Sequence, residues 1–310
     1  MNSRWLSILV AGLVALASTP EPASAQAPAS PPAAAALPDA DPALWVVRDE
    51  DTTIYLFGTF HMLDGRPWFN DEVRTAFDAS GELVLEAVQP ADPTAISRQV
   101  AQYALDAQRR PLSGRLTPEV SERLSRTLTE MNLPAMGALP IDPWYASITI
   151  TVAAVQRLGL LGANGAENAL TVAARERNIP VGQLESFEWQ MQLLDGIPEE
   201  LQLYMLRATL DELARLPQLI GPALGAWSSG DVERLEAVLN DPTSDNPELR
   251  RIFLGQRNRT WAAWIRERMA RPGTVFIAVG AGHLAGRDSV QAVLAEGGLR
   301  AERVPHVEAQ

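Results

Sequence analysis

The sequence predicts an α/β fold in which a mostly parallel central sheet is flanked by helices and carries a large helical insertion. Short apolar runs recur at residues 53–57, 82–86, 179–184 and 275–279. Segments with helical periodicity separate them, as expected for the crossovers that join parallel strands. Each run is apolar almost throughout, which is typical of strands that helices cover on both faces.

The first 25 residues predict a secretory signal peptide. Arg4 supplies a positive charge, residues 6–17 form an apolar stretch too short to span a bilayer, and residues 23–25 fit a small-x-small cleavage site. Residues 26–41 are rich in alanine and proline and predict a linker. We therefore expect a secreted protein, periplasmic in a Gram-negative source, with no membrane span in the mature chain.

A single domain is expected over residues 42–310. Strands are predicted at residues 43–47, 53–57, 82–86, 179–184, 275–279 and 299–304. Helices are predicted at residues 70–79 (with Asn70 as N-cap), 167–177, 186–194, 247–270 and 288–295. The helical insertion spans about residues 92–165, where Thr117 and Pro118 form a helix start. A second helical region spans about residues 186–270, with breaks expected near residues 217, 222 and 225.

The same short motif follows two of the predicted strands. Gly58 begins a Gly-x-x-His sequence that ends at His61, and Gly280 begins another that ends at His283. The glycines fit sharp turns where a Cβ would clash. Because the carboxyl ends of parallel strands meet at one edge of a sheet, we expect the two imidazoles to face one another there.

Two glutamates end further predicted strands, Glu86 and Glu185. Two imidazoles with one or two carboxylates suit a divalent first-row metal such as Mn, Co, Fe or Zn. We expect His61, His283 and Glu86 to bind this metal. A bound metal lowers the pKa of its water, with Glu86 as a ligand or as general base and Glu185 assisting.

Several residues near these motifs allow a second interpretation. Glu185 is equally suited to cap the helix that follows it, and Glu167 suits the first turn of a helix, where the helix dipole favours an acid. Arg257 is a candidate to orient a substrate carboxylate or oxyanion, or else a solvated helix residue. Trp261 suits the core, and His306 lies in the tail as a bystander.

Composition removes several classes of chemistry. The chain contains no cysteine and no lysine, which excludes thiolate catalysis, Cys-based metal sites, Schiff-base chemistry and the P-loop lysine. The formal net charge of −12 argues against nucleic acid as a partner. Metal-assisted hydrolysis is the most economical chemistry that remains.

The order and spacing of these motifs resemble the TraB/GumN family, also called the TIKI/TraB group, over residues 43–304. The matching stretches are Leu56–His61, Leu83–Glu86, Gly165–Glu167, Leu184–Ser186, Arg257–Arg259 and Val279–Leu284. The resemblance implies a TIKI/erythromycin-esterase-like fold and, from the animal relatives, a divalent-metal-dependent protease with metal at His61, Glu86 and His283. Glu167 stands where the family usually has aspartate.

We therefore expect an exported metal-dependent hydrolase, with a peptidase favoured, that acts on a peptide or other small exported substrate. One alternative is a non-catalytic regulatory protein that binds a peptide or a glycan, as in exopolysaccharide or pheromone systems. Another is a metal-free esterase that uses histidine and glutamate. Activity that survives chelation would indicate the metal-free enzyme, and ligand binding without turnover would indicate the regulatory protein.

Overall fold

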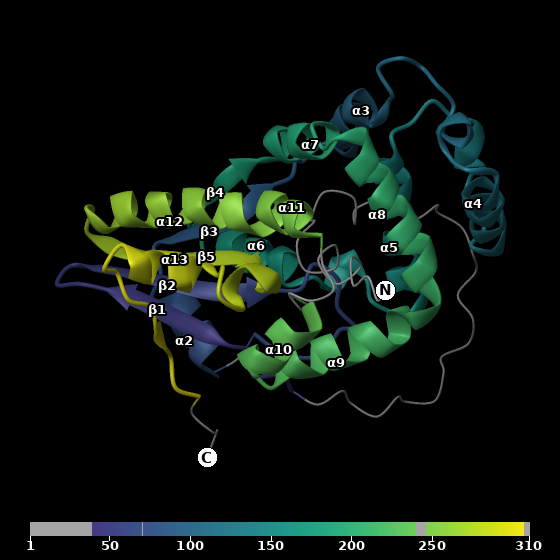
Figure 1. The fold of residues 1–310 in the computed structure, drawn as a ribbon. Helices are drawn as coiled ribbons and strands as arrows, with labels where there is room; N and C mark the ends of the chain where they lie inside the picture. Colours follow the sequence, from purple (N-terminus) through teal and green to yellow (C-terminus); the bar gives the residue numbers. More distant parts are fainter. Residues whose placement is uncertain (1–38, 70, 240–245, 307–310) are drawn as a thin grey trace.

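The computed structural model describes residues 39–69, 71–239 and 246–306. Its centre is a six-stranded sheet with the order β4-β3-β5-β2-β1-β6 (Figure 1). β4, β3, β5 and β2 pair in parallel, whereas β1 pairs antiparallel with β2 and with β6. The strands are β1 (Leu44–Arg48), β2 (Thr52–Thr59), β3 (Glu82–Val88), β4 (Val181–Ser186), β5 (Gly273–Gly280) and β6 (Glu302–Arg303). The predicted α/β fold is confirmed.

The start of the chain is described only from residue 39. The predicted signal peptide, most of the predicted linker and the predicted cap Asn70 lie outside the described residues. Ala40 is fully buried, and its N–H donates to the carbonyl of Pro67 at 2.8 Å. The last residues of the predicted linker are therefore part of the packed structure.

Alternating residues of the strands pack against two different layers of helices. Leu56 and Ile277 face Trp261 and Ile265 of α12 (Gln256–Met269), in a cluster that also includes α13 (Val290–Glu296). The intervening Phe57 and Phe276 face the opposite layer. That layer includes α2 (Asp71–Asp78) and α6 (Ala166–Glu176). Two-sided burial explains why each strand is apolar almost throughout.

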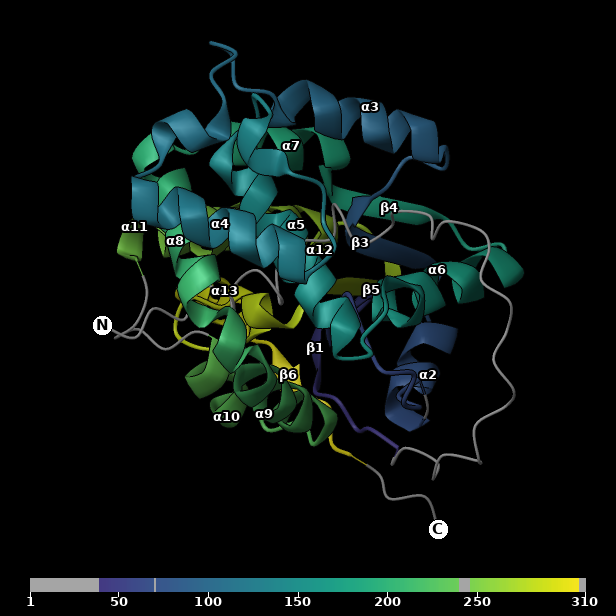
Figure 2. The same ribbon diagram turned by 90° about the vertical axis from the view of Figure 1, so that its right-hand side faces the viewer.

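The remaining helices lie mostly beyond the carboxyl ends of the parallel strands. Viewed from that side in Figure 2, α4, α5 and α8 lie in front of the sheet, with α3 and α7 above it. These and the other longer helices are α3 (Pro93–Ala104), α4 (Pro118–Glu130), α5 (Pro143–Arg157), α7 (Phe187–Asp195), α8 (Glu199–Glu212), α9 (Leu216–Ser228) and α10 (Val232–Leu239). Short 3₁₀ turns join several of them, including η1 (Leu112–Arg115). Among the described residues, no helix is both long and apolar enough to cross a bilayer.

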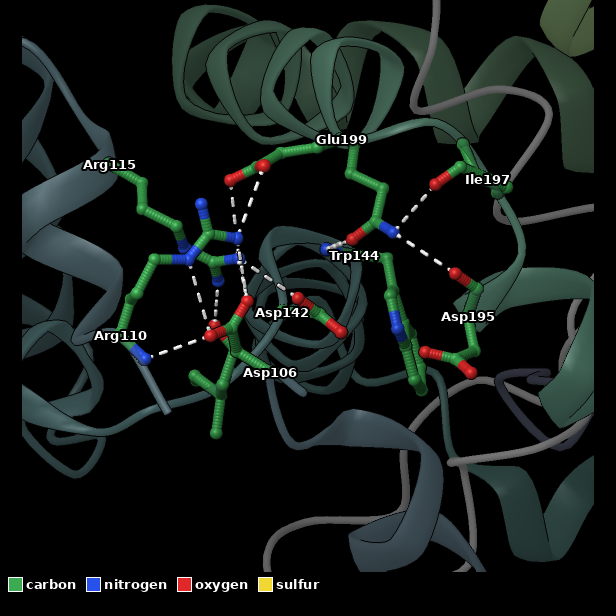
Figure 3. Close-up of polar contacts among 10 residues, drawn as sticks. Asp106, Arg110, Arg115, Asp142, Trp144, Asp195, Ile197 and Glu199 are labelled. Carbon is green, nitrogen blue, oxygen red and sulfur yellow. Dashed lines mark hydrogen bonds and ion pairs between the residues drawn. The ribbon is translucent and has the colours of Figure 1, made fainter. Parts of the chain in front are cut away.

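A polar network joins three parts of the helical region (Figure 3). Arg115 of η1 donates to Asp106 at 2.8 Å and to Asp142, which precedes α5, at 3.0 Å. The same guanidinium reaches Glu199 at the start of α8 at 3.3 Å. Arg110 also bonds Asp106 and Glu199. The network therefore holds the end of α3 and the beginnings of α5 and α8 together.

Several boundaries differ from the sequence prediction. Strands β3 and β4 continue past their glutamates, so Glu86 and Glu185 lie within the strands and do not end them. Helix α9 continues through Pro222 and Gly225, where breaks were predicted, because burial of neighbours such as Ile220 and Leu224 holds it in place. The last strand is only two residues long, since only that part pairs with β1.

The long helix predicted at residues 247–270 forms, but not as a uniform α-helix. It begins as α11 (Pro247–Arg250), passes through a π-helical turn, η5 (Arg251–Gly255), and continues as α12. Asn246 caps its start, with its side chain accepting from the N–H groups of Glu248 and Leu249. Single π turns inside α-helices are frequent near functional sites, and Arg257 follows this one by two residues.

Candidate functional site

Four predicted site residues lie at the carboxyl ends of four neighbouring parallel strands. His61 follows β2, and His283 lies in the 3₁₀ turn η6 (Ala281–Leu284) that follows β5. Glu86 and Glu185 lie in the last residues of β3 and β4. All four side chains are buried. Because the two Gly-x-x-His motifs begin on paired strands, with Thr59 opposite Gly280, the sequence prediction that they converge on one region holds for the backbone.

His61 is paired with Glu167, in the first turn of α6. Its Nδ1 lies 2.5 Å from Oε1 of Glu167, which also accepts a hydrogen bond from the hydroxyl of Thr59. The helix is held against this strand end because the N–H of Ala166 donates to the carbonyl of Phe60 at 3.1 Å. Nε2 of His61 is buried and has no hydrogen-bond partner among the described residues.

The electrostatics of this pair make His61 a stronger base than an isolated imidazole. Burial lowers the pKa of His61, but the charge of Glu167 and the contact with it outweigh burial, so the pKa lies above its ordinary value. Burial raises the pKa of Glu167, but the opposing attraction of His61 leaves that pKa below its ordinary value. A carboxylate on one ring nitrogen and a free second nitrogen are the arrangement of an oriented general base.

His283 has a different set of partners. Its Nδ1 lies 2.5 Å from Oδ1 of Asn258, whose amide nitrogen donates to the carbonyl of Asp288. The amide therefore presents its oxygen, so Nδ1 of His283 carries the proton and Nε2 is an acceptor. Nε2 lies 3.2 Å from Nη1 of Arg257. Burial, followed by the charges of Arg257 and His61, holds the pKa of His283 well below its ordinary value, so this imidazole is neutral.

Arg257 lies at the centre of the cluster and uses all five of its N–H donors. Nε donates to Glu185 at 2.9 Å, and Nη1 donates to the carbonyl of Phe253 and to His283, both at 3.2 Å. Nη2 donates to Glu185 at 2.8 Å and to Glu86. Burial by itself lowers the pKa of Arg257, but the two carboxylates outweigh it and raise the pKa above its ordinary value.

The two carboxylates have further partners. Glu86 accepts from the backbone N–H of Gly280 at 3.2 Å and from Gln190 at 3.0 Å. Glu185 accepts from the indole N–H of Trp261 at 2.8 Å. Burial raises the pKa of Glu185, although Arg257 opposes this effect. Glu185 thus points into the cluster and does not cap the following helix, where the hydroxyl of Ser186 accepts the N–H of Trp189.

The donor types of this cluster fit a divalent metal, but their arrangement does not. Nε2 of His283 and one oxygen of Glu86 already accept from Arg257, and the other oxygen of Glu86 accepts from Gly280. Among the histidine and glutamate side chains of this cluster, Nε2 of His61 is available, since it has neither a hydrogen bond nor an ionic contact among the described residues. Within residues 39–69, 71–239 and 246–306, no three histidine, aspartate or glutamate side chains are placed to hold one ion. A metal at His61, Glu86 and His283 would require the guanidinium to leave.

A separate small apolar cavity, partly open to solvent, lies against the same turn. Gly58, Ala281 and Leu284 form one wall, and Trp227 and Leu235 form part of another. None of the polar side chains described above lines it. The cavity therefore adjoins the backbone that carries His283 but does not contain the chemical groups.

Sequence reasoning found part of this site. The structure brings together five of the predicted residues, namely His61, Glu86, Glu185, Arg257 and His283. Glu167 lies in the first turn of a helix, as expected, and in addition contacts His61. The tail histidine His306 is partly exposed and contacts Glu72. The residues whose contacts in the site were not predicted are Thr59, Gln190 and Asn258, whereas Trp261 lies in the core as expected and also donates to Glu185. Asn258 and Trp261 follow Arg257 by one and four residues on α12, and that helical spacing is the only signal that could have found them.

These observations define a class of protein: an α/β sheet that gathers two histidines, three glutamates and an arginine at the carboxyl edge of its parallel strands. Residues 43–303 match the model of the TraB/PrgY/gumN family. Since the match covers most of the chain, the protein belongs to this family, and the resemblance drawn from the motifs is confirmed.

Similar proteins carry no described activity. The uncharacterized protein YbaP of Escherichia coli K12 is 26% identical over 183 residues, which cover 59% of this chain and 67% of YbaP. An uncharacterized protein of Treponema pallidum is 24% identical over 269 residues, which cover 79% of this chain and 78% of that protein. No solved structure matches the chain. The comparisons therefore assign a family but no substrate.

Proposed function

We propose that this protein is an exported hydrolase in which His61 activates the attacking water and Glu167 holds its imidazole in place. One observation carries the proposal: Nδ1 of the buried His61 lies 2.5 Å from Glu167, while Nε2 has no partner among the described residues. A structural histidine in a protein interior ordinarily satisfies both nitrogens. A histidine with one nitrogen oriented by a carboxylate and the other free is suited to proton transfer.

The chemistry follows from this arrangement. Nε2 of His61 takes a proton from water as the oxygen attacks a carbonyl carbon, and Glu167 stabilises the imidazolium that forms. The imidazolium then returns the proton to the leaving nitrogen or oxygen as the tetrahedral intermediate collapses. Such general acid–base catalysis contributes about 10²–10⁴-fold in rate. The absence of cysteine and lysine from the chain leaves histidine as its main group for proton transfer near neutral pH.

The substrate class is proposed as an exported peptide or small ester. The signal-like first 25 residues support a location outside the cytoplasm, periplasmic in a Gram-negative source. The metal-dependent form, with His61, Glu86 and His283 binding Mn, Co, Fe or Zn, stays a prediction that differs in one result. It requires turnover to stop on chelation and to return when one of these metals is added.

The test is a screen of the purified mature chain against peptide and ester libraries, with and without a chelator. We expect turnover that His61→Ala and Glu167→Gln each lower by at least 10²-fold. His306→Ala is the matched control, because this histidine lies at the surface, and it should retain full activity.

The outcomes separate the candidate functions. Turnover that survives the chelator supports general-base catalysis, whereas turnover lost with the chelator and restored by metal supports the metal-dependent hydrolase. Turnover unaffected by His61→Ala would rule out the proposal. A ligand bound equally well by wild type and His61→Ala, with no product, would indicate the regulatory binding protein.

A further inference from the structure

We infer that the guanidinium of Arg257 is the resident cation of this site and neutralises Glu86 and Glu185 beside His283 in place of a divalent metal. The inference deepens the proposed function and rests on it for the view that this cluster performs chemistry. The inference concerns the positive charge inside the site, and it is tested by measuring metal binding. The proposed function is tested by measuring turnover, so either one can fail without the other.

Every N–H donor of the Arg257 side chain has an acceptor. The guanidinium has five N–H donors, and each has an acceptor within the protein: two carboxylates, one imidazole and one backbone carbonyl. An arginine meant to bind a substrate anion would present donors to a cavity, as expected for recognition of carboxylates. Arg257 presents none, so its charge serves the buried side chains around it.

The acceptor atoms around Arg257 are also engaged in hydrogen bonds with its guanidinium. Glu86 and Glu185 are charged groups in a buried region, and a buried carboxylate needs a cation or several donors close by. Nη2 of Arg257 bonds both of them. Nε2 of His283 also accepts from this guanidinium. A divalent ion would compete for these same atoms.

Arg257 is also held in place by residues of its own helix. Its Nη1 bonds the carbonyl of Phe253, which belongs to the π turn η5. Its Cζ lies 4.9 Å from the ring centre of Trp261 one helical turn later. The neighbouring Asn258 fixes the proton of His283 on Nδ1, so that Nε2 faces the guanidinium. The guanidinium is thus held by Phe253, Trp261 and His283 in addition to the two carboxylates.

The inference predicts that removing the guanidinium creates a metal site. Arg257→Ala frees the oxygens of two glutamates and Nε2 of His283, which are donor types suited to Co²⁺ or Zn²⁺. These side chains are not placed to hold an ion in the structure, so binding requires them to move together once the guanidinium is gone. We expect Arg257→Ala to bind about one equivalent of Co²⁺ in equilibrium dialysis, with visible absorption. Wild type should bind far less than one equivalent under the same conditions. Adding His283→Ala to the variant should abolish the binding.

Arg250→Ala is the matched control. Arg250 is a buried arginine on the same long helix and is paired with Asp288 at 2.8 Å. It contacts none of Glu86, Glu185 and His283 among the described contacts, so this variant should bind no more Co²⁺ than wild type.

The test gives a result even if Arg257→Ala does not fold in the absence of metal. If Arg257→Ala folds only when Co²⁺ is present, the ion has replaced the missing charge and the inference is supported. Arg257→Lys, which keeps a positive charge, should fold without metal and bind none. The inference is overturned if wild type binds one equivalent of Co²⁺ that His283→Ala abolishes, or if Arg257→Ala folds and binds none.

Discussion

His61 and His283 occupy the same four-residue motif, yet their neighbours give them opposite properties. The carboxylate of Glu167 outweighs burial and raises the pKa of His61, whereas burial, followed by the charge of Arg257, holds the pKa of His283 well below its ordinary value. A histidine responds to nearby charges because its ordinary pKa lies close to neutrality. Equal sequence motifs therefore do not imply equal charge properties, and the metal pair expected from the sequence stays a prediction.

Gly165 offers a test of how closely α6 must approach the site. A Cβ at this position would lie 2.3 Å from the carbonyl oxygen of His61, which is far inside van der Waals contact. We expect Gly165→Ala to lower the free energy of unfolding by about 3 kcal/mol and to displace Glu167 from His61. Urea unfolding followed by circular dichroism measures the first effect.

Gly221→Ala is the control for this substitution. Gly221 lies in α9 with no atom within 4 Å of an added Cβ. Alanine there should raise the free energy of unfolding by about 0.5–1 kcal/mol, because glycine is the poorer helix former. Equal effects of the two substitutions would contradict the close approach of α6.

At the scale of elements, parallel pairing is what gathers the site. β4, β3, β5 and β2 run side by side in one direction, so that groups at the end of each strand meet at a common edge. The helices α6 and α12 then add Glu167 and Arg257 from opposite faces of the sheet. The site is therefore assembled from six elements, of which none holds more than part of the chemistry.

The network in the helical region predicts a loss of stability in acid. Bonding to Arg110 outweighs burial and holds the pKa of Asp106 at about 2, against an ordinary value of 3.8. A lowered folded-state pKa contributes stability that is complete above the unfolded pKa and is lost as the pH falls from about 3.8 to about 2. Asp106→Asn should therefore be less stable than wild type at pH 7, by a margin that shrinks across that interval.

Thermal unfolding of both proteins between pH 7 and pH 2 measures that margin. Burial raises the pKa of Asp142, which has the opposite dependence on pH, but Asp142 is present in both proteins and largely cancels from the difference. Asp211→Asn is the control. Asp211 is exposed and paired only at the surface with Arg123, so its loss should change the free energy of unfolding by less than about 0.5 kcal/mol at any pH.

At the scale of the whole molecule, the sheet and its two helical layers share one continuous apolar interior on each face. Phe276 is fully buried at the centre of one of them, with its ring 5.8 Å from that of Phe57 and 5.6 Å from that of Phe77. It thereby connects β5, β2 and α2. Positions of this kind tie the strands that carry the site to the layer beneath them.

Phe276→Ala should therefore destabilise the whole fold. Removing a buried phenylalanine leaves a cavity and costs about 3–5 kcal/mol. Val172→Ala on the exposed face of α6 should change stability by less than about 0.5 kcal/mol. Denaturant melts of the two variants provide the comparison, and a loss below about 1 kcal/mol for Phe276→Ala would contradict its central position.

The order of elements could be read from the chain, because apolar runs and helix starts such as Thr117 with Pro118 act through neighbours in sequence. The convergence of His61, Glu86, Glu185 and His283 could also be inferred, since parallel strands end together. The charge state of each group could not. The contacts of His61 with Glu167 and of Glu86 with Arg257 span more than a hundred residues, and pKa values depend on distances of a few ångströms. Local chemistry therefore determined the fold and the candidate residues, whereas only tertiary packing decided which side chain carries a free nitrogen and which cation lies between the carboxylates.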